Sequence, residues 1–162
     1  MISLKNLKKN NDSGFTIVEL LIVIVVIGIL ALLVITTYAG IQAKARNSKR
    51  QTDLASLQTH LEAFYNDNGY YPSLADMNNQ SGFVKVKLNG TDPQAFLDPS
   101  HVDKADLNLV AAPAAKTYAY AVTNAAGTSC EADDTTCAKY VLTATYEGQV
   151  NGASTYVKSS LN

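Results

Sequence analysis

One carboxylate stands inside a long apolar stretch near the start of the chain. The stretch covers residues 14–35, and its single charged side chain is that of Glu19. A carboxylate inside a membrane is costly, and buried charges persist mainly where they are paired. A cut between Gly14 and Phe15 would create an α-amino group one helical turn from Glu19, and that amine could neutralise the carboxylate of a neighbouring copy. The alternative is that the stretch spans a membrane and that Glu19, close to its first residues, reaches the interface between lipid and water.

Two cysteines form a second group of residues with possible chemistry. Cys130 and Cys137 flank the segment EADDTT. Two cysteines a short loop apart favour a disulfide over a metal pair, because a metal would need further ligands. Glu131, Asp133 and Asp134 in the same loop could hold calcium, which takes several oxygen ligands. We expect an acidic loop tip in solvent and no metal site, with calcium as the alternative, because the spacing and glycine pattern of an EF-hand are missing.

Catalytic chemistry finds little support. His60, in a predicted helix, and His101, in a predicted loop, have no nucleophile or metal-binding motif at a suitable spacing. The sequence also lacks a glycine-rich phosphate-binding loop, so nothing in it indicates that this chain hydrolyses ATP. We therefore expect a protein that is not an enzyme and that holds no cofactor.

The apolar stretch has the length of a membrane span. As a helix, residues 15–35 would cross the roughly 30 Å hydrocarbon core of a bilayer. Three lysines precede it in the first nine residues, so the positive-inside rule places the N-terminus in the cytoplasm and the bulk of the chain outside. The 162 residues therefore divide into a leader (residues 1–14), a membrane helix (residues 15–35) and one head domain (residues 36–162).

The helix is expected to continue beyond the membrane as an amphipathic segment. Leucine and aromatic side chains recur there at three- and four-residue spacing, namely Leu54, Leu57, Leu61, Phe64 and Tyr65. This stripe predicts a helix that packs on a globular head. Asn68 and Gly69 are a C-terminal cap signal, and Pro72 prevents the helix from resuming.

An antiparallel sheet completes the predicted head. After an irregular stretch at about residues 69–115, three segments rich in β-branched and aromatic residues occupy about residues 116–160, namely KTYAYAVTN, KYVLTATYEG and STYVKSSL. The first segment places Tyr118, Tyr120 and Val122 on one face. The alternation in FVKVKL, residues 83–88, also predicts a short strand or extended edge. The predicted fold class is α+β, with the amphipathic stripe covering the sheet.

Four cations lie between the membrane helix and the amphipathic stripe: Lys44, Arg46, Lys49 and Arg50. Charge runs are usually solvated, so we expect a solvated face next to the membrane. In a filament, the same cluster could pair with acidic residues of neighbouring heads. Binding to nucleic acid has weak support, because no aromatic residues interleave with these cations and the net charge of the chain is −1.

The segment GFTIVE, followed by the long apolar helix, resembles the start of type IV pilins and of the pseudopilins of type II secretion. The resemblance implies that a prepilin peptidase cuts after Gly14, methylates the new N-terminus at Phe15, and leaves Glu19 to steer subunits into a filament. Thr16 fits the family pattern, and the small residue Gly28 would allow close helix contacts in the filament core. The implied partners are further copies of the chain, an assembly platform protein with its ATPase, and membrane lipid before assembly.

Three further features follow from the resemblance. The family often has a disulfide near the C-terminus, and major pseudopilins commonly bind calcium in a C-terminal loop. Many major pilins also carry a proline eight residues after the glycine that matches Gly28. This chain has Thr36 there, so a kink in the helix is less strongly encoded.

The resemblance implies a structural subunit of a type IV pilus that serves adhesion, twitching motility or DNA uptake. Such a subunit is a single-pass protein of the cytoplasmic membrane before assembly and part of a cell-surface filament afterwards. One alternative is a pseudopilin of a type II secretion system. An alternative of another class is a membrane-anchored binding module that never polymerises, and an uncut bond after Gly14 would favour it.

Overall fold

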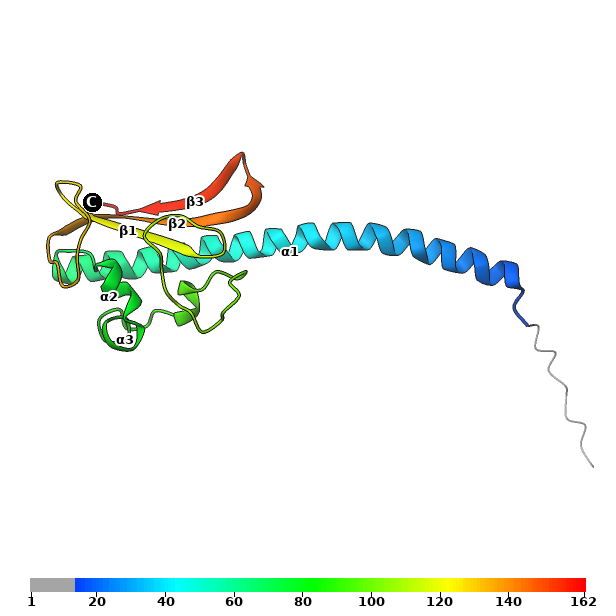
Figure 1. Cartoon of the computed structure of the whole chain (residues 1–162), viewed down its shortest axis with the longest axis horizontal. Coiled ribbons are helices and arrows are strands. Elements are labelled where there is room, and N and C mark those ends of the chain that lie inside the picture. The colour runs from blue at the N-terminus through cyan, green and yellow to red at the C-terminus, as the bar shows by residue number, and fades with distance from the viewer. Residues whose placement is uncertain (1–13) are drawn as a thin grey trace, which may run out of the picture. The chain divides into compact units, whose positions relative to one another are not determined.

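The computed structural model describes residues 14–162, apart from the side chain of Thr36, so most of the predicted leader lies outside the described residues. The chain forms two compact units, one up to Gly40 and one at Ile41–Asn162. The elements are α1 (Ile17–Asn68), α2 (Leu74–Asn78), the π-helical turn η1 (Gln80–Val84), α3 (Lys85–Lys87), the 3-10 helix η2 (Pro93–Phe96), β1 (Tyr118–Asn124), β2 (Cys137–Val150) and β3 (Ala153–Ser159) (Figure 1).

Helix α1 begins and ends close to the predicted positions. It starts at Ile17, two residues after the expected start, and ends at Asn68. Gly69 adopts a φ of +80°, and its backbone N–H donates to the carbonyl of Tyr65 at 2.7 Å. Glycine is favoured there because it adopts a left-handed conformation without a Cβ clash. With no proline within it, the helix is continuous from one end to the other.

The three predicted strands form one antiparallel sheet in the order β1, β2, β3. Tyr118 of β1 lies opposite Ala144 of β2, which in turn lies opposite Tyr156 of β3. Asn151 and Gly152 connect β2 to β3, and both have positive φ angles. This is the backbone conformation that a tight two-residue hairpin requires, and Asn-Gly is its favoured sequence.

The core of the head lies between the sheet and the second half of α1, which run alongside each other in Figure 1. Leu54 and Leu61 of α1 are fully buried, as are Tyr118 and Tyr120 of β1 and Leu142 of β2. Full burial of one such side chain stabilises the fold by about 1.5 to 3 kcal/mol. The α+β fold class and the covering role of the amphipathic stripe are therefore confirmed.

The segment at residues 83–88 is helical, so the predicted strand is wrong. Residues 83–87 lie in η1 and α3, and Leu88 directly follows α3. Val84 and Leu88 are buried, whereas the two lysines between them are exposed. The pattern of apolar residues in this segment alternates, but the two side chains that reach the core are four residues apart, which is the spacing of a helix.

Candidate assembly and processing site

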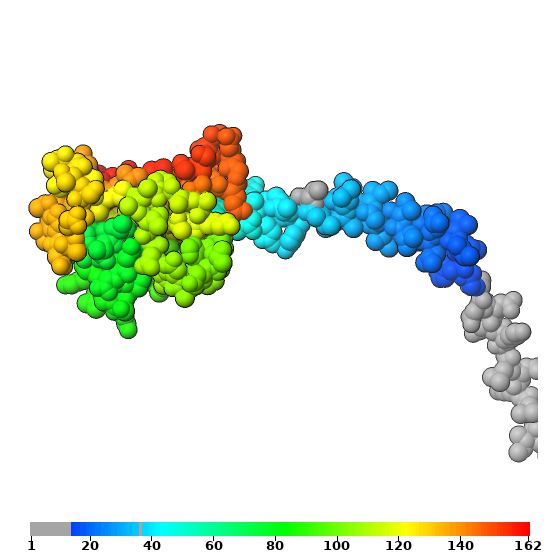
Figure 2. All heavy atoms as spheres, in the orientation of Figure 1, coloured from blue at the N-terminus to red at the C-terminus, as the bar shows by residue number. Residues whose placement is uncertain are grey.

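The described part of the first unit is the beginning of α1 and the three residues before it. Every described side chain in residues 14–40 is exposed, including Phe15 at 90% and Ile35 at 66%. In Figure 2 the described residues of this segment form a single column of atoms. Among the described residues, α1 is long and apolar enough to cross a membrane by length and composition. Because so large an apolar surface is unfavourable in water, lipid or other protein must cover it.

Glu19 forms a reciprocal cap at the start of α1. Its carboxylate Oε2 accepts hydrogen bonds from the backbone N–H and from the hydroxyl of Thr16, both at 2.8 Å. The Glu19 backbone N–H donates to the Thr16 hydroxyl oxygen at 3.2 Å. This is a capping box, which satisfies two backbone donors that a helix start leaves free. The T-x-x-E spacing in the sequence could have predicted it, because it is the known signature of such a cap.

The residues of the expected cleavage site precede this cap. Gly14 and Phe15 are exposed and lie outside the helix, and an added Cβ at Gly14 would meet nothing within 4 Å. An added Cβ at Gly28 would also meet nothing within 4 Å, so the helix surface is open to close approach there. Cleavage, methylation and the pairing of Glu19 with a neighbour's amine stay predictions.

The basic cluster is only in part the solvated face that the sequence predicts, because Lys44 and Lys49 are exposed whereas Arg50 is buried. The side chain of Arg50 is 1% exposed and binds both carboxylate oxygens of Asp98, at 2.6 and 2.9 Å. Arg46 binds Glu147 at 2.5 and 2.7 Å, and Lys49 forms an ion pair with Asp53. Two of these carboxylates lie far from the cations in sequence, so no local pattern could have revealed the pairs. The fourth cation, Lys44, is exposed as expected.

Glu147 joins β2 to α1. Its carboxylate accepts hydrogen bonds from Arg46, Arg50 and Ser100, the last two at 2.9 and 2.6 Å. The side-chain amide of Asn47 also bonds the backbone of Glu147, as donor at 3.2 Å and as acceptor at 3.0 Å. The hydrogen bond from Arg46, foremost, lowers the pKa of Glu147 to about 2. These charges therefore anchor the end of β2 on α1 within the head.

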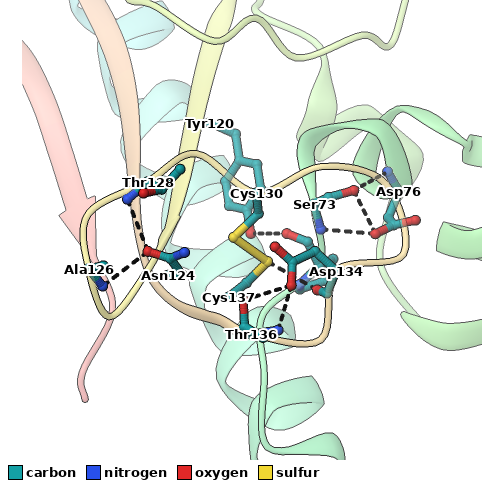
Figure 3. Close-up of a disulfide and its surroundings, with 11 residues drawn as sticks. Ser73, Asp76, Tyr120, Asn124, Ala126, Thr128, Cys130, Asp134, Thr136 and Cys137 are labelled. Carbon is teal, nitrogen blue, oxygen red and sulfur yellow. Dashed lines mark hydrogen bonds between the residues drawn. A yellow bond between two sulfur atoms is a disulfide. The ribbon is translucent and has the colours of Figure 1, made fainter.

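The predicted disulfide between Cys130 and Cys137 is present, with a Cα–Cα distance of 6.0 Å (Figure 3). It closes the loop that leads from β1 into β2. Asp134 lies beside it, and its Oδ1 accepts hydrogen bonds from the backbone N–H and the hydroxyl of Thr136 at 2.8 and 2.7 Å. The two bonds lower the pKa of Asp134.

The same loop does not bring together the three acidic residues named for the calcium alternative. Within the described part of the chain, the ligand atoms that converge are those of Cys130, Asp134 and Cys137, and the two sulfurs are bonded to each other. Glu131 and Asp133 are not part of this group. The solvated loop tip stays the prediction, and calcium binding by the three acidic residues stays its alternative.

Comparison with known proteins supports the processing motif. The sequence profile of the prokaryotic N-terminal methylation motif matches residues 9–35. The type II secretion system core protein G of Aeromonas hydrophila is 30% identical over 98 residues, which cover 60% of this chain and 67% of that protein. The type IV major pilin PilA of Myxococcus xanthus is 36% identical over 78 residues, covering 48% of this chain and 34% of the pilin.

Another relative, the type II secretion system core protein G of Escherichia coli K12, is 40% identical over 64 residues, which cover 40% of this chain and 44% of that protein. The chain thus spans less than half the length of these last two relatives. No solved structure matches the chain significantly.

The matched motif contains Gly14, Phe15, Glu19 and Gly28. It implies processing by a prepilin peptidase and assembly into pilus or pseudopilus filaments, and with the apolar first half of α1 it fits a membrane-anchored pilin. The names of the three relatives describe a pilin and core proteins of a secretion system, and none describes an enzyme. The chain therefore belongs to the family that comprises type IV pilins and the pseudopilins of type II secretion.

Proposed function

We propose that this protein is the structural subunit of a type IV pilus. It is cut between Gly14 and Phe15, held in the cytoplasmic membrane by residues 15–35 with its head outside, and extracted into a helical filament. The observation that carries the proposal is the exposed apolar surface of the first half of α1, which lies within the methylation motif at residues 9–35. In a filament, other copies of the same helix would cover that surface.

Cleavage changes the chemistry around Glu19. In the uncut chain its carboxylate is satisfied by Thr16 of the same helix. The cut adds a positive α-amino group at Phe15, and a carboxylate in a region of low dielectric gains more from a cation than from a hydroxyl. We propose that Glu19 of one subunit pairs with the amine of a neighbour, which sets the register, while Gly28 allows the helices to approach closely.

The proposed partners are further copies of the chain, the prepilin peptidase, an assembly platform protein with its ATPase, and lipid before assembly. Nucleic acid is not proposed as a partner of the basic cluster. Three of its four cations are engaged in ion pairs within the molecule, namely Arg46, Lys49 and Arg50.

A second candidate is a pseudopilin of a type II secretion system. The match to the Aeromonas core protein G favours it, because that alignment covers 67% of the relative whereas the pilin alignment covers 34%. A pseudopilin would use the same cleavage and the same helix contacts, but its filament would stay inside the envelope. The location of the filament therefore decides between the two candidates.

Two variants test the role of Glu19. We expect Glu19→Ala to insert into the membrane normally but to form no filaments, because the neighbouring amine loses its partner. Thr16→Val is the matched control, since it removes the hydroxyl that bonds Glu19 and keeps the carboxylate. If both variants lost filaments to the same extent in electron micrographs, Glu19 would act through the helix cap, and normal filaments from Glu19→Ala would refute its role in assembly.

A further inference from the structure

A cavity of about 420 Å³ lies in the head beside η1, α3 and the turn that follows them. Its lining includes Ser81, Val84, Lys85, Leu88, Asn89 and Leu107. Sites for small ligands in proteins commonly have volumes of about 300 to 1,000 Å³ and are mainly apolar, with a few polar groups. All of its lining residues belong to the second unit, and none of them is part of α1 or of the processing motif.

The floor of the cavity is apolar and belongs to the core. Val84 and Leu88 are 5% and 4% exposed. The chain around them follows a π-helical turn, in which the Val84 backbone N–H donates to the carbonyl of Asn79 at 3.0 Å. A turn with this wider hydrogen-bond spacing is rare, and such turns occur frequently at functional sites.

The rim carries polar side chains that the protein itself does not use. Within the described residues, the side chains of Ser81, Lys85 and Asn89 have no hydrogen-bond or ion-pair partner, although they line the cavity. Two other lining side chains are already engaged, since Gln80 donates to the carbonyl of Met77 at 2.9 Å and Thr91 to that of Leu88 at 2.7 Å. The rim therefore offers one cation and two neutral hydrogen-bonding groups to a ligand.

We propose that this cavity binds a short-chain carboxylate, with the chain on Val84 and Leu88 and the carboxylate on Lys85. A single ammonium group matches a monoanion, whereas phosphate groups commonly engage several cations or backbone N–H groups. The hydroxyl of Ser81 and the amide of Asn89 can donate to the remaining lone pairs of the carboxylate. This binding function goes beyond assembly and does not depend on it.

Lysine footprinting of the full-length chain in lipid nanodiscs tests the proposal, with hexanoate as the probe. The acetylation rates of Lys85 and Lys87 are compared by peptide mass spectrometry. Both lysines belong to α3 and are exposed, but only Lys85 lines the cavity, so Lys87 is an internal control. With a Kd of about 1 mM, about 10 mM hexanoate fills roughly nine tenths of the sites, so acetylation of Lys85 falls about tenfold. Acetylation of Lys87 is unchanged.

Matched ligands and variants define the outcome. Acetate lacks the chain and hexanol lacks the charge, so we expect neither to protect Lys85. Asn89→Trp fills the cavity mouth with an aromatic ring and abolishes protection by hexanoate, whereas Lys87→Met preserves it. Equal protection of Lys85 and Lys87, protection by acetate, or no protection at about 10 mM hexanoate would each overturn the proposal.

Discussion

At the scale of single residues, two carboxylates hold the head together by accepting several hydrogen bonds each. Glu147 accepts from Arg46, Arg50 and Ser100. Glu62 of α1 accepts from the hydroxyls of Tyr71 and Tyr140 at 2.9 and 2.8 Å, and from the backbone N–H of Leu161 at 3.2 Å. Both carboxylates therefore connect α1 to distant parts of the chain. The pKa of Tyr71 is raised to about 12, mainly because its hydroxyl is buried.

The low pKa of Glu147 makes the stability of the head depend on pH. The folded pKa of about 2 lies below the ordinary value of 4.5, so ionised Glu147 stabilises the fold above pH 4.5, and this contribution is lost as the pH falls toward about 2. Because the side chain is partly exposed, we expect a loss of roughly 1 to 2 kcal/mol. Urea unfolding of the full chain in mild detergent at several pH values measures it.

Glu147→Gln is the control for this pH dependence. It keeps the shape of the side chain and removes the charge. The difference in unfolding free energy between wild type and variant should therefore shrink as the pH falls from 4.5 to about 2. Burial raises the pKa of Asp53, so this residue changes the stability with pH in the opposite direction. Asp53 is present in both proteins, so its contribution cancels in the difference. A difference that does not change with pH would contradict the assigned ion pairs.

Arg50 allows a second prediction at this scale. The side chain of Asp98 is fully buried, and Arg50→Met would leave its carboxylate without a cation. Removal of one partner of a buried ion pair costs about 3 to 5 kcal/mol, because the remaining charge stays buried. Lys44→Met, at an exposed position of the same cluster, should change the unfolding free energy by less than about 0.5 kcal/mol. Equal effects in denaturation experiments would rule out the buried pair.

At the scale of the elements, hydrophobic spacing predicted the long helix and the sheet. The stripe from Leu54 to Phe64 fits only the three- and four-residue spacing of a helix, and the alternation at Tyr118 and Tyr120 fits only a strand. In these segments the apolar pattern therefore identifies the type of secondary structure. The segment at residues 83–88 is short enough to fit both periods, and the core selected the helical one. The disulfide was predicted from the short spacing of the two cysteines and from their place in the segment expected outside the membrane.

The basic cluster could not be predicted at this scale. Arg50 pairs with Asp98 and Glu147, which lie 48 and 97 residues away in sequence, and only the folded chain brings them together. Local charge patterns indicate solvation because most charge runs are solvated. Burial of Arg50 depends on how β2 and the segment around Asp98 pack on α1, which a local pattern does not encode.

The disulfide should stabilise the loop between β1 and β2. Cys130 and Cys137 are seven residues apart. In the chain-entropy model, closing this loop lowers the entropy of the unfolded chain and so raises the free energy of unfolding by about 2 to 3 kcal/mol. We expect the double variant Cys130→Ser, Cys137→Ser to lose this amount in urea unfolding. Wild type under reducing conditions is the control, and it should unfold like the variant. No loss in either case would show that the bond does not constrain the unfolded state.

At the scale of the whole molecule, the chain combines two units of opposite chemistry. The head, Ile41–Asn162, has its own core and satisfies its buried charges internally. The part of α1 that belongs to the first unit has apolar side chains that are exposed. A molecule of this kind needs lipid or other copies around its helix, which is the physical basis for a subunit that moves from a membrane into a filament.

The most direct test of this account is to shear intact cells and to examine the released material by electron microscopy and mass spectrometry. The account predicts thin fibres that contain this chain, beginning at an N-methylated Phe15. A processed chain that stays in the envelope would contradict an exported pilus and favour the pseudopilin. An uncut chain that begins at Met1 would contradict the central claim that this protein is processed and assembled.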